Sequence, residues 1–94
     1  MKDFKKADDG KIMMSLIEPQ FIKGTATVLT LGAEKYSVGN WKNCDDRQRY
    51  EDALLRHIYD YLQGNKCDKE TSMSHLYHAS CNLMFLDYLD RKGV

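Results

Sequence analysis

Two Gly-Asn pairs, at residues 39–40 and 64–65, divide the chain into three stretches whose apolar residues recur with the period of an α-helix. Glycine and asparagine readily adopt the backbone conformations of tight turns, so each pair favours a break between helices. Apolar residues at i, i+3, i+4 and i+7 are typical of a helix with one buried face. The sequence therefore predicts an all-α fold, a small domain of three helices.

Local signals set the ends of these helices. Pro19 suits a first helical turn, where its missing N–H would be unpaired anyway. Asp45 or Asp46 can cap the second helix, and Thr71 or Ser72 can cap the third. The predicted segments are an N-terminal arm at 1–17 and helices at 18–36, 46–62 and 72–89.

Each predicted helix carries one stripe of residues expected to face the core. In the first helix the stripe is Ile22, Ala26, Leu29, Ala33 and Tyr36, with Gly32 on the same side as a point of close approach. In the second it is Tyr50, Leu54, His57, Ile58 and Tyr61. In the third it is His75, His78, Asn82, Phe85, Leu86 and Leu89, widened by Leu76, Ala79 and Leu83.

The length and charge of the chain limit its function. A chain of 94 residues forms one domain, 1–94, and buries a modest fraction of its surface, so a homo-oligomer is expected. Lys plus Arg number 14 and Asp plus Glu number 14, and this balance argues against binding of duplex nucleic acid.

The cysteines and the apolar segments bear on the compartment. Cys44, Cys67 and Cys81 are odd in number and form no C-x-x-C pair. No signal peptide opens the chain, and no apolar run approaches the ~20 residues of a membrane span. We therefore expect a cytoplasmic protein with free thiols and no membrane partner.

Polar side chains fall on faces predicted to be buried. His75, His78 and Asn82 share the apolar stripe of the third helix, and His57 lies on that of the second. Burying one such group without a partner costs about 1–3 kcal/mol, which a small domain cannot repeat several times. Either these groups satisfy one another or they line a cleft for a polar ligand.

The chemistry open to these residues is limited. The i, i+3 spacing of His75 and His78 allows both imidazoles to reach one ion, with Asp68 or Glu70 completing a mixed site. No H-E-x-x-H motif is present, so the metal signal is weak. Nothing indicates an activated thiolate at Cys81. Trp41 follows directly after a turn, which favours either a role in packing or a role as a stacking platform for a nucleotide base.

Beyond these patterns, the sequence resembles a known family, the phage dATP/dGTP diphosphohydrolases, over residues 8–89. The resemblance is carried by Leu31-Gly32-Ala33-Glu34-Lys35-Tyr36, Gly39-Asn40-Trp41, Tyr50 with Ala53, Arg56-His57, Asp68 with Glu70, and His75-Leu76 with His78-Ala79, Cys81-Asn82 and Phe85-Leu86. The opening Asp9-Gly10-Lys11, Leu16-Ile17 and Pro19 also fit.

The resemblance implies kinship with the MazG-like all-α pyrophosphatases, which are oligomers with sites between helices. It implies cleavage of a nucleoside triphosphate between the α and β phosphates, with Mg²⁺ or Mn²⁺ helping to activate water. MazG-like proteins carry E-x-x-E and E-x-x-D motifs, and this chain has neither. Its histidines and Arg56 are alternatives that could contact phosphate directly.

Two functions follow. The first is hydrolysis of dATP or dGTP to monophosphate and pyrophosphate by a metal-dependent enzyme. The alternative is a non-catalytic phage protein, using no metal, that sequesters a linear or cyclic nucleotide signal of host defence. The residues predicted for catalysis are His57, His78 and Glu70; for substrate binding Lys35, Tyr36, Asn40, Trp41, Arg56, His57, His75 and Asn82; and for metal binding Asp68, Glu70, His75 and His78.

Overall fold

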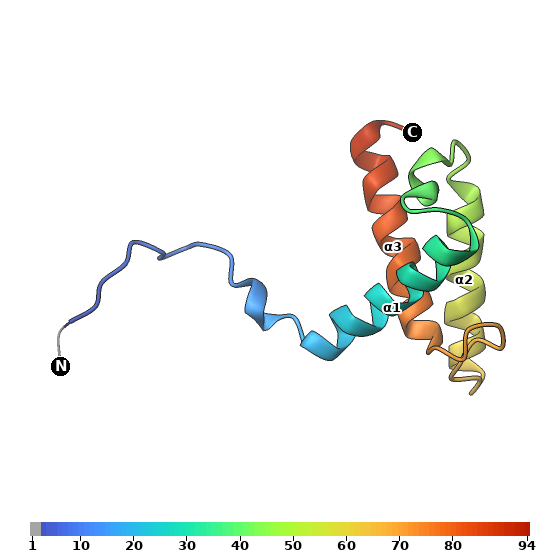
Figure 1. Cartoon of the computed structure of the whole chain (residues 1–94), viewed down its shortest axis with the longest axis horizontal. Helices are drawn as coiled ribbons and strands as arrows, with labels where there is room; N and C mark the ends of the chain where they lie inside the picture. Colours follow the sequence, from blue (N-terminus) through green and yellow to red (C-terminus); the bar gives the residue numbers. More distant parts are fainter. Residues whose placement is uncertain (1–2) are drawn as a thin grey trace.

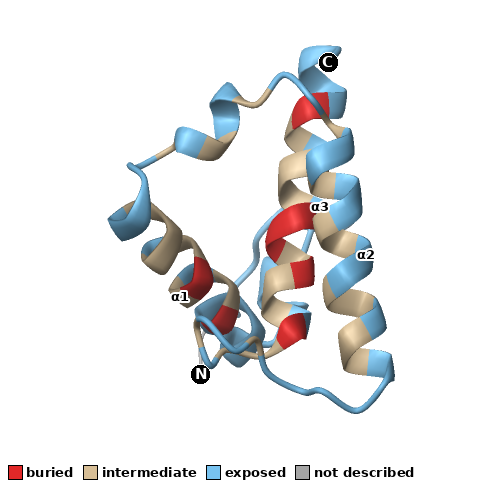
Figure 2. Ribbon diagram, turned by 90° about the vertical axis from the view of Figure 1, so that its right-hand side faces the viewer, coloured by how far each residue is buried: buried red, intermediate tan, exposed pale blue. Residues whose placement is uncertain are grey.

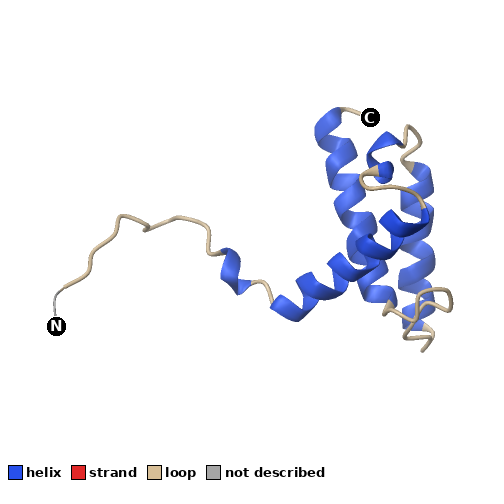
Figure 3. Cartoon of the chain, viewed as in Figure 1, coloured by secondary structure: helices blue, strands red, loops and turns tan. Residues whose placement is uncertain are grey.

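The computed structural model describes residues 3–94, and it is built from helices (Figures 1 and 3). In chain order these are the 3₁₀ helix η1 (Met14–Leu16), α1 (Pro19–Lys35), the 3₁₀ helix η2 (Asn40–Asn43), α2 (Gln48–Leu62) and α3 (His75–Lys92). No strand occurs in residues 3–94, where the single β-bridge joins Cys67 to Ser74. The predicted all-α class is confirmed. Residues 1 and 2, the start of the predicted arm, lie outside the described part.

The three long helices pack mainly as two pairs, α2 with α3 and α1 with α3. α2 and α3 lie side by side and antiparallel, while α1 packs across α3 (Figure 1). Residues 3–13 extend away from the helices, and the part of the arm before α1 includes only the single turn of η1. In residues 3–94 no helix is long and apolar enough to cross a membrane.

Side-chain hydrogen bonds stabilise the first turns of α2 and α3, although the N-cap of α2, Arg47, makes no such bond itself. The Asp46 carboxylate accepts a hydrogen bond from the Gln48 backbone N–H at 3.2 Å, as expected of a cap. α3 begins at His75 rather than at 72, because the Ser74 hydroxyl caps it by accepting from the Leu76 N–H at 3.1 Å. Ser72 itself has a φ of 60°, which no residue of a right-handed helix adopts.

α1 packs through a face different from the predicted stripe. Its buried residues are Gly24 and Val28, and the Thr25 hydroxyl lies 2.6 Å from the Ser80 hydroxyl of α3. The Tyr77 ring lies directly against Gly24, where a Cβ would collide with it. Small residues thus allow α3 to approach. The predicted close approach at Gly32 is wrong, since a Cβ there would meet open space.

The remaining corrections concern side chains predicted to be buried. In α1, Ile22 is 53% exposed and Tyr36 65% exposed. In α3, Leu76 and Leu83 of the second apolar row are 39% and 56% exposed. Both helices carry more apolar residues than their contacts bury. Exposed positions recur along α1 and α3 (Figure 2), and periodicity alone does not distinguish them from buried ones.

Trp41 fixes the segment between α1 and α2. Its ring stacks on Phe85 at 4.7 Å between centroids and meets Tyr88 edge-on at 5.0 Å. The Tyr50 hydroxyl donates to the Trp41 carbonyl at 2.7 Å. This is the packing role that the sequence suggested, and it holds η2 against α3, at one side of the cleft described next.

Candidate functional site

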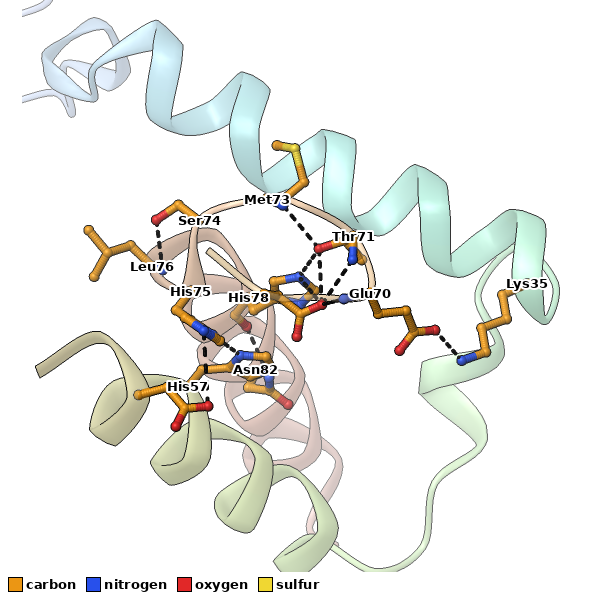
Figure 4. Close-up of polar contacts among 12 residues, drawn as sticks. Lys35, His57, Glu70, Thr71, Met73, Ser74, His75, Leu76, His78 and Asn82 are labelled. Carbon is orange, nitrogen blue, oxygen red and sulfur yellow. Dashed lines mark hydrogen bonds and ion pairs between the residues drawn. The ribbon is translucent and has the colours of Figure 1, made fainter. Parts of the chain in front are cut away.

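The site lies where α2, α3 and the loop of residues 63–74 meet. α2 supplies His57, α3 supplies His75 and His78, and we call these three residues the histidine cluster (Figure 4). The loop supplies Asp68 and Thr71. His57 comes from a different helix than His75 and His78, so the antiparallel pairing of α2 with α3 is what assembles the cluster.

The three imidazoles contact one another. His57 Nδ1 lies 2.8 Å from His75 Nδ1, and the His57 ring stacks on His78 at 4.5 Å with an interplanar angle of 11°. His75 is buried, at 5% exposure, and His78 Nε2 lies 2.7 Å from the Thr71 hydroxyl. On the outer side His75 Nε2 is 4.0 Å from an Asp60 carboxylate oxygen. The cluster is therefore held from both sides.

The loop positions Asp68 before any ligand is present. Its Oδ1 accepts hydrogen bonds from the Glu70 N–H at 2.9 Å, the Thr71 N–H at 3.0 Å and the Thr71 hydroxyl at 3.3 Å. The Asp68 backbone closes the turn, because its N–H donates to the Met73 carbonyl and its carbonyl accepts from Ser72. In the described chain none of these hydrogen bonds uses Oδ2 of Asp68.

Burial keeps His57 and His78 uncharged. Desolvation and the neighbouring His78 and His75 lower the pKa of His57 to about 4. Desolvation also lowers the pKa of His78, although Asp68 opposes it. These two imidazoles are thus neutral at pH 7. Burial alone would raise the pKa of Asp68, but the hydrogen bonds from Thr71 and Glu70, with His78 nearby, lower it, so this carboxylate is ionised.

A cleft of about 1460 Å³ extends from the segment between α1 and α2 to the histidine cluster. Of the predicted site residues it is lined by Lys35, Tyr36, Asn40, Trp41, Arg56, His57, Asp68, Glu70, His78 and Asn82. A second pocket of about 510 Å³ reaches the cluster from the other side and includes His75, Asp60, Asp68 and Glu70. Every residue predicted for catalysis, substrate binding or metal binding thus borders the cleft or the second pocket.

Some of these side chains are already engaged. The Glu70 carboxylate, 68% exposed, accepts from Lys35 Nζ at 2.6 Å, away from the imidazoles (Figure 4). The buried Asn82 amide donates to the His78 carbonyl of its own helix at 2.9 Å. Burial raises the pKa of the Cys81 thiol to about 11, so this cysteine has no activated thiolate.

Sequence reasoning missed two residues at the site. Asp60 lies one helical turn after His57 on α2, and the i, i+3 spacing was a signal that could have found it. Thr71 was considered only as a helix cap, and its contact with His78 depends on the turn at Asp68. No short sequence motif that we considered predicts this turn at Asp68.

These features define a class: a small all-α protein with a polar cleft that ends at the neutral imidazoles of His57 and His78 and the ionised carboxylate of Asp68. A family model described as dATP/dGTP diphosphohydrolase, N-terminal, matches residues 2–94, and the chain belongs to this family. A protein of Salmonella phage PMBT28 called dATP/dGTP diphosphohydrolase is 39% identical over 84 residues. The match covers 89% of this chain but 29% of that relative. No solved structure matches the chain.

Proposed function

We propose that this chain binds a purine deoxynucleoside triphosphate in the cleft and hydrolyses it to the monophosphate and pyrophosphate. The observation that carries the proposal is the cleft itself, which joins Lys35 and Arg56 to the histidine cluster and Asp68 in a member of this family. The name of the phage relative supports the substrate class. Because the chain spans less than a third of that relative, the activity of the whole relative is a proposal here.

The side chains divide between the phosphates and the base. Arg56, exposed on α2 at the cleft, is a cation for the phosphates, because a guanidinium presents several donors at once. Tyr36 is 65% exposed and could stack on a base with the ring face that Lys35 does not cover, whereas the Trp41 ring is packed against Phe85 and Tyr88. A neutral imidazole, His57 or His78, can accept a proton from the attacking water.

The magnesium or manganese that the family resemblance implies does not fit this donor set well. Both ions favour carboxylate, carbonyl and water oxygens over imidazole nitrogen. Of the carboxylates at the histidine cluster, Asp68 groups with His57 and His75, whereas the Glu70 carboxylate is bound by Lys35. We therefore derive no catalytic step through a protein-bound magnesium ion.

One observation favours a second function, sequestration of a nucleotide without cleavage. Among the described residues, Asp68 is the one carboxylate that groups with two imidazoles closely enough to share an ion, and Asp60 contacts only His75, whereas a two-metal hydrolase would use several carboxylates. A cleft with neutral imidazoles and a free arginine could still hold a phosphorylated ligand. This alternative predicts that the nucleotide is recovered intact after the protein is denatured.

Incubation with dGTP, dATP and their ribose counterparts, followed by chromatography of bound and free species, separates the two functions. Hydrolysis predicts pyrophosphate and monophosphate, with turnover reduced at least about tenfold in Arg56→Gln, because one charged contact is worth 1.5–3 kcal/mol. Arg91→Gln is the matched control, since Arg91 pairs with Asp87 and borders neither pocket. If no nucleotide is bound or cleaved at any concentration tested, both functions are excluded.

A further inference from the structure

His57 and His75 of the histidine cluster, together with Asp68, are arranged like the ligands of a single metal ion. One ligand atom from each of His57, Asp68 and His75 lies within 4.8 Å of the other two. We propose that these three residues bind one divalent transition-metal ion of the class that imidazole prefers, such as Zn²⁺, and not Mg²⁺. The role of this ion in nucleotide cleavage rests on the function proposed above, whereas the binding itself does not.

The distance between the two imidazoles supports a shared ion. Zn–N bonds of about 2.0–2.1 Å place two ligands of one tetrahedral ion roughly 3.3 Å apart. His57 Nδ1 and His75 Nδ1 are 2.8 Å apart, so a shift of a few tenths of an ångström would admit the ion. The same two nitrogens can share only one proton as a neutral pair. A cation between them would use both Nδ1 lone pairs, and each ring would then carry its proton on Nε2, which in His75 faces Asp60.

The surroundings resemble the outer shell of a metal site. A metal-bound imidazole commonly presents its other N–H to a carboxylate, which fixes the ring. His75 has such a carboxylate, Asp60, 4.0 Å from its Nε2, and the His75 ring is almost completely buried. The His75 ring is thus oriented with Nδ1 towards His57 and Nε2 towards Asp60, as a metal ligand would be.

Asp68 is fixed in advance as the third ligand. Its three hydrogen bonds from the loop all go to Oδ1, and none in the described chain goes to Oδ2. A carboxylate held this way can offer Oδ2 to a cation without losing its loop contacts. Two imidazole nitrogens and one carboxylate oxygen also leave coordination positions open for water or a phosphate oxygen.

The choice of ion follows from the donors. Imidazole suits zinc, copper, iron and nickel, whereas magnesium requires near-octahedral oxygen coordination. Glu70, predicted from the sequence as a metal ligand, points to Lys35 instead. His78, also predicted as a ligand, uses Nε2 to contact Thr71, so we place it beside the ion and not on it.

Zinc uptake by the metal-free full chain tests the proposal without any nucleotide. After treatment with EDTA, competition with a chromophoric chelator is expected to give one Zn²⁺ per chain, unaffected by millimolar Mg²⁺. Zinc should also raise the thermal midpoint, because it binds the folded state. No uptake, or equal competition by magnesium, overturns the proposal. Neither result depends on whether nucleotides are cleaved.

Two variants and two controls locate the ion. Asp68→Asn keeps a side-chain oxygen for the loop and should weaken zinc binding by at least about tenfold, as should His57→Gln. Glu70→Gln, the matched carboxylate two residues along, should bind as the unchanged protein does. Cys67→Ser tests the exposed neighbouring thiol and should also retain zinc. Equal affinity in Asp68→Asn and Glu70→Gln, or loss in Cys67→Ser, overturns the assignment, and circular dichroism confirms that each variant is folded.

Discussion

At the scale of single residues, the packing of α1 on α3 depends on Gly24, which carries a hydrogen atom where other residues have a Cβ. Gly24 has no side chain, and the Tyr77 ring occupies the space that a Cβ would fill. That ring also lies against Phe21, with centroids 6.0 Å apart, which restricts its retreat. We expect Gly24→Ala to destabilise the protein, because overpacking costs about 1–3 kcal/mol and exceeds the gain of up to ~1 kcal/mol in helix propensity.

Gly32 provides the control, since it lies in the same helix and a Cβ there meets no atom within 4 Å. Gly32→Ala should raise the free energy of unfolding by up to about 1 kcal/mol. Urea unfolding of both variants measures the difference. Equal shifts in the two variants would show that α1 does not pack on Tyr77 through Gly24.

Cys81 offers a second prediction, on pH. Its thiol pKa is raised from 9.0 to about 11 by burial, so between these values the unfolded chain ionises and the folded chain does not. The unfolded state then binds fewer protons, and the free energy of unfolding falls as pH rises, by up to about 2–3 kcal/mol across the interval. Tyr50 adds a loss of the same sign between pH 10 and 12, since burial raises its pKa from 10.0 to about 12.

Comparison with Cys81→Ala isolates this effect, because the substitution removes the ionisable group and should flatten the slope between pH 9 and 10, below the range in which Tyr50 contributes. Alkylation at pH 8 gives an independent check. The exposed Cys67 should react at once, and the 2%-exposed Cys81 only when the chain unfolds. Rapid modification of Cys81 in the folded protein would contradict its burial.

At the scale of elements, the loop before α3 stores backbone strain at one position. Ser72 has a φ of 60°, a conformation that costs an ordinary residue about 1–2 kcal/mol. Ser72→Gly should relieve this cost and, after the added entropy of the unfolded chain, stabilise the protein by up to about 1 kcal/mol.

Ser74→Ala, which removes the cap of α3, should instead lower the free energy of unfolding by about 1 kcal/mol. Thermal unfolding distinguishes these outcomes, and destabilisation by Ser72→Gly would exclude strain at this position.

The elements also show what the sequence could predict. The faces of α2 and α3 followed from periodicity, and because they brought His57 onto the same side as His75, the histidine cluster was predictable in outline. The face of α1 was not, since its contact uses Gly24 and Thr25 rather than its largest apolar residues. The contact of Thr71 with His78 depends on a turn at Asp68 whose hydrogen bonds form only in three dimensions.

At the scale of the whole molecule, the chain is too extended to bury its own apolar residues. Its radius of gyration is 17.0 Å, whereas a compact domain of this length has about 12 Å. The side chains left in solvent include a continuous group before α1, namely Ile12, Met13, Met14, Leu16 and Ile17, which are 52–90% exposed. Single apolar residues are common on protein surfaces, but a group of five neighbours in the sequence favours association between chains.

Removal of residues 1–17 tests this association. In the single chain these residues contribute no buried side chain from residue 3 onwards, so their loss should change the free energy of unfolding of the monomer by less than about 0.5 kcal/mol. The full chain should sediment at a multiple of 10.9 kDa, with the shortened chain shifted towards the monomer. Double substitution of Ile12 and Leu16 by Ser should act like the deletion, because it removes the apolar contacts and keeps the length. A full chain that stays monomeric at high concentration would mean that these apolar side chains remain in water.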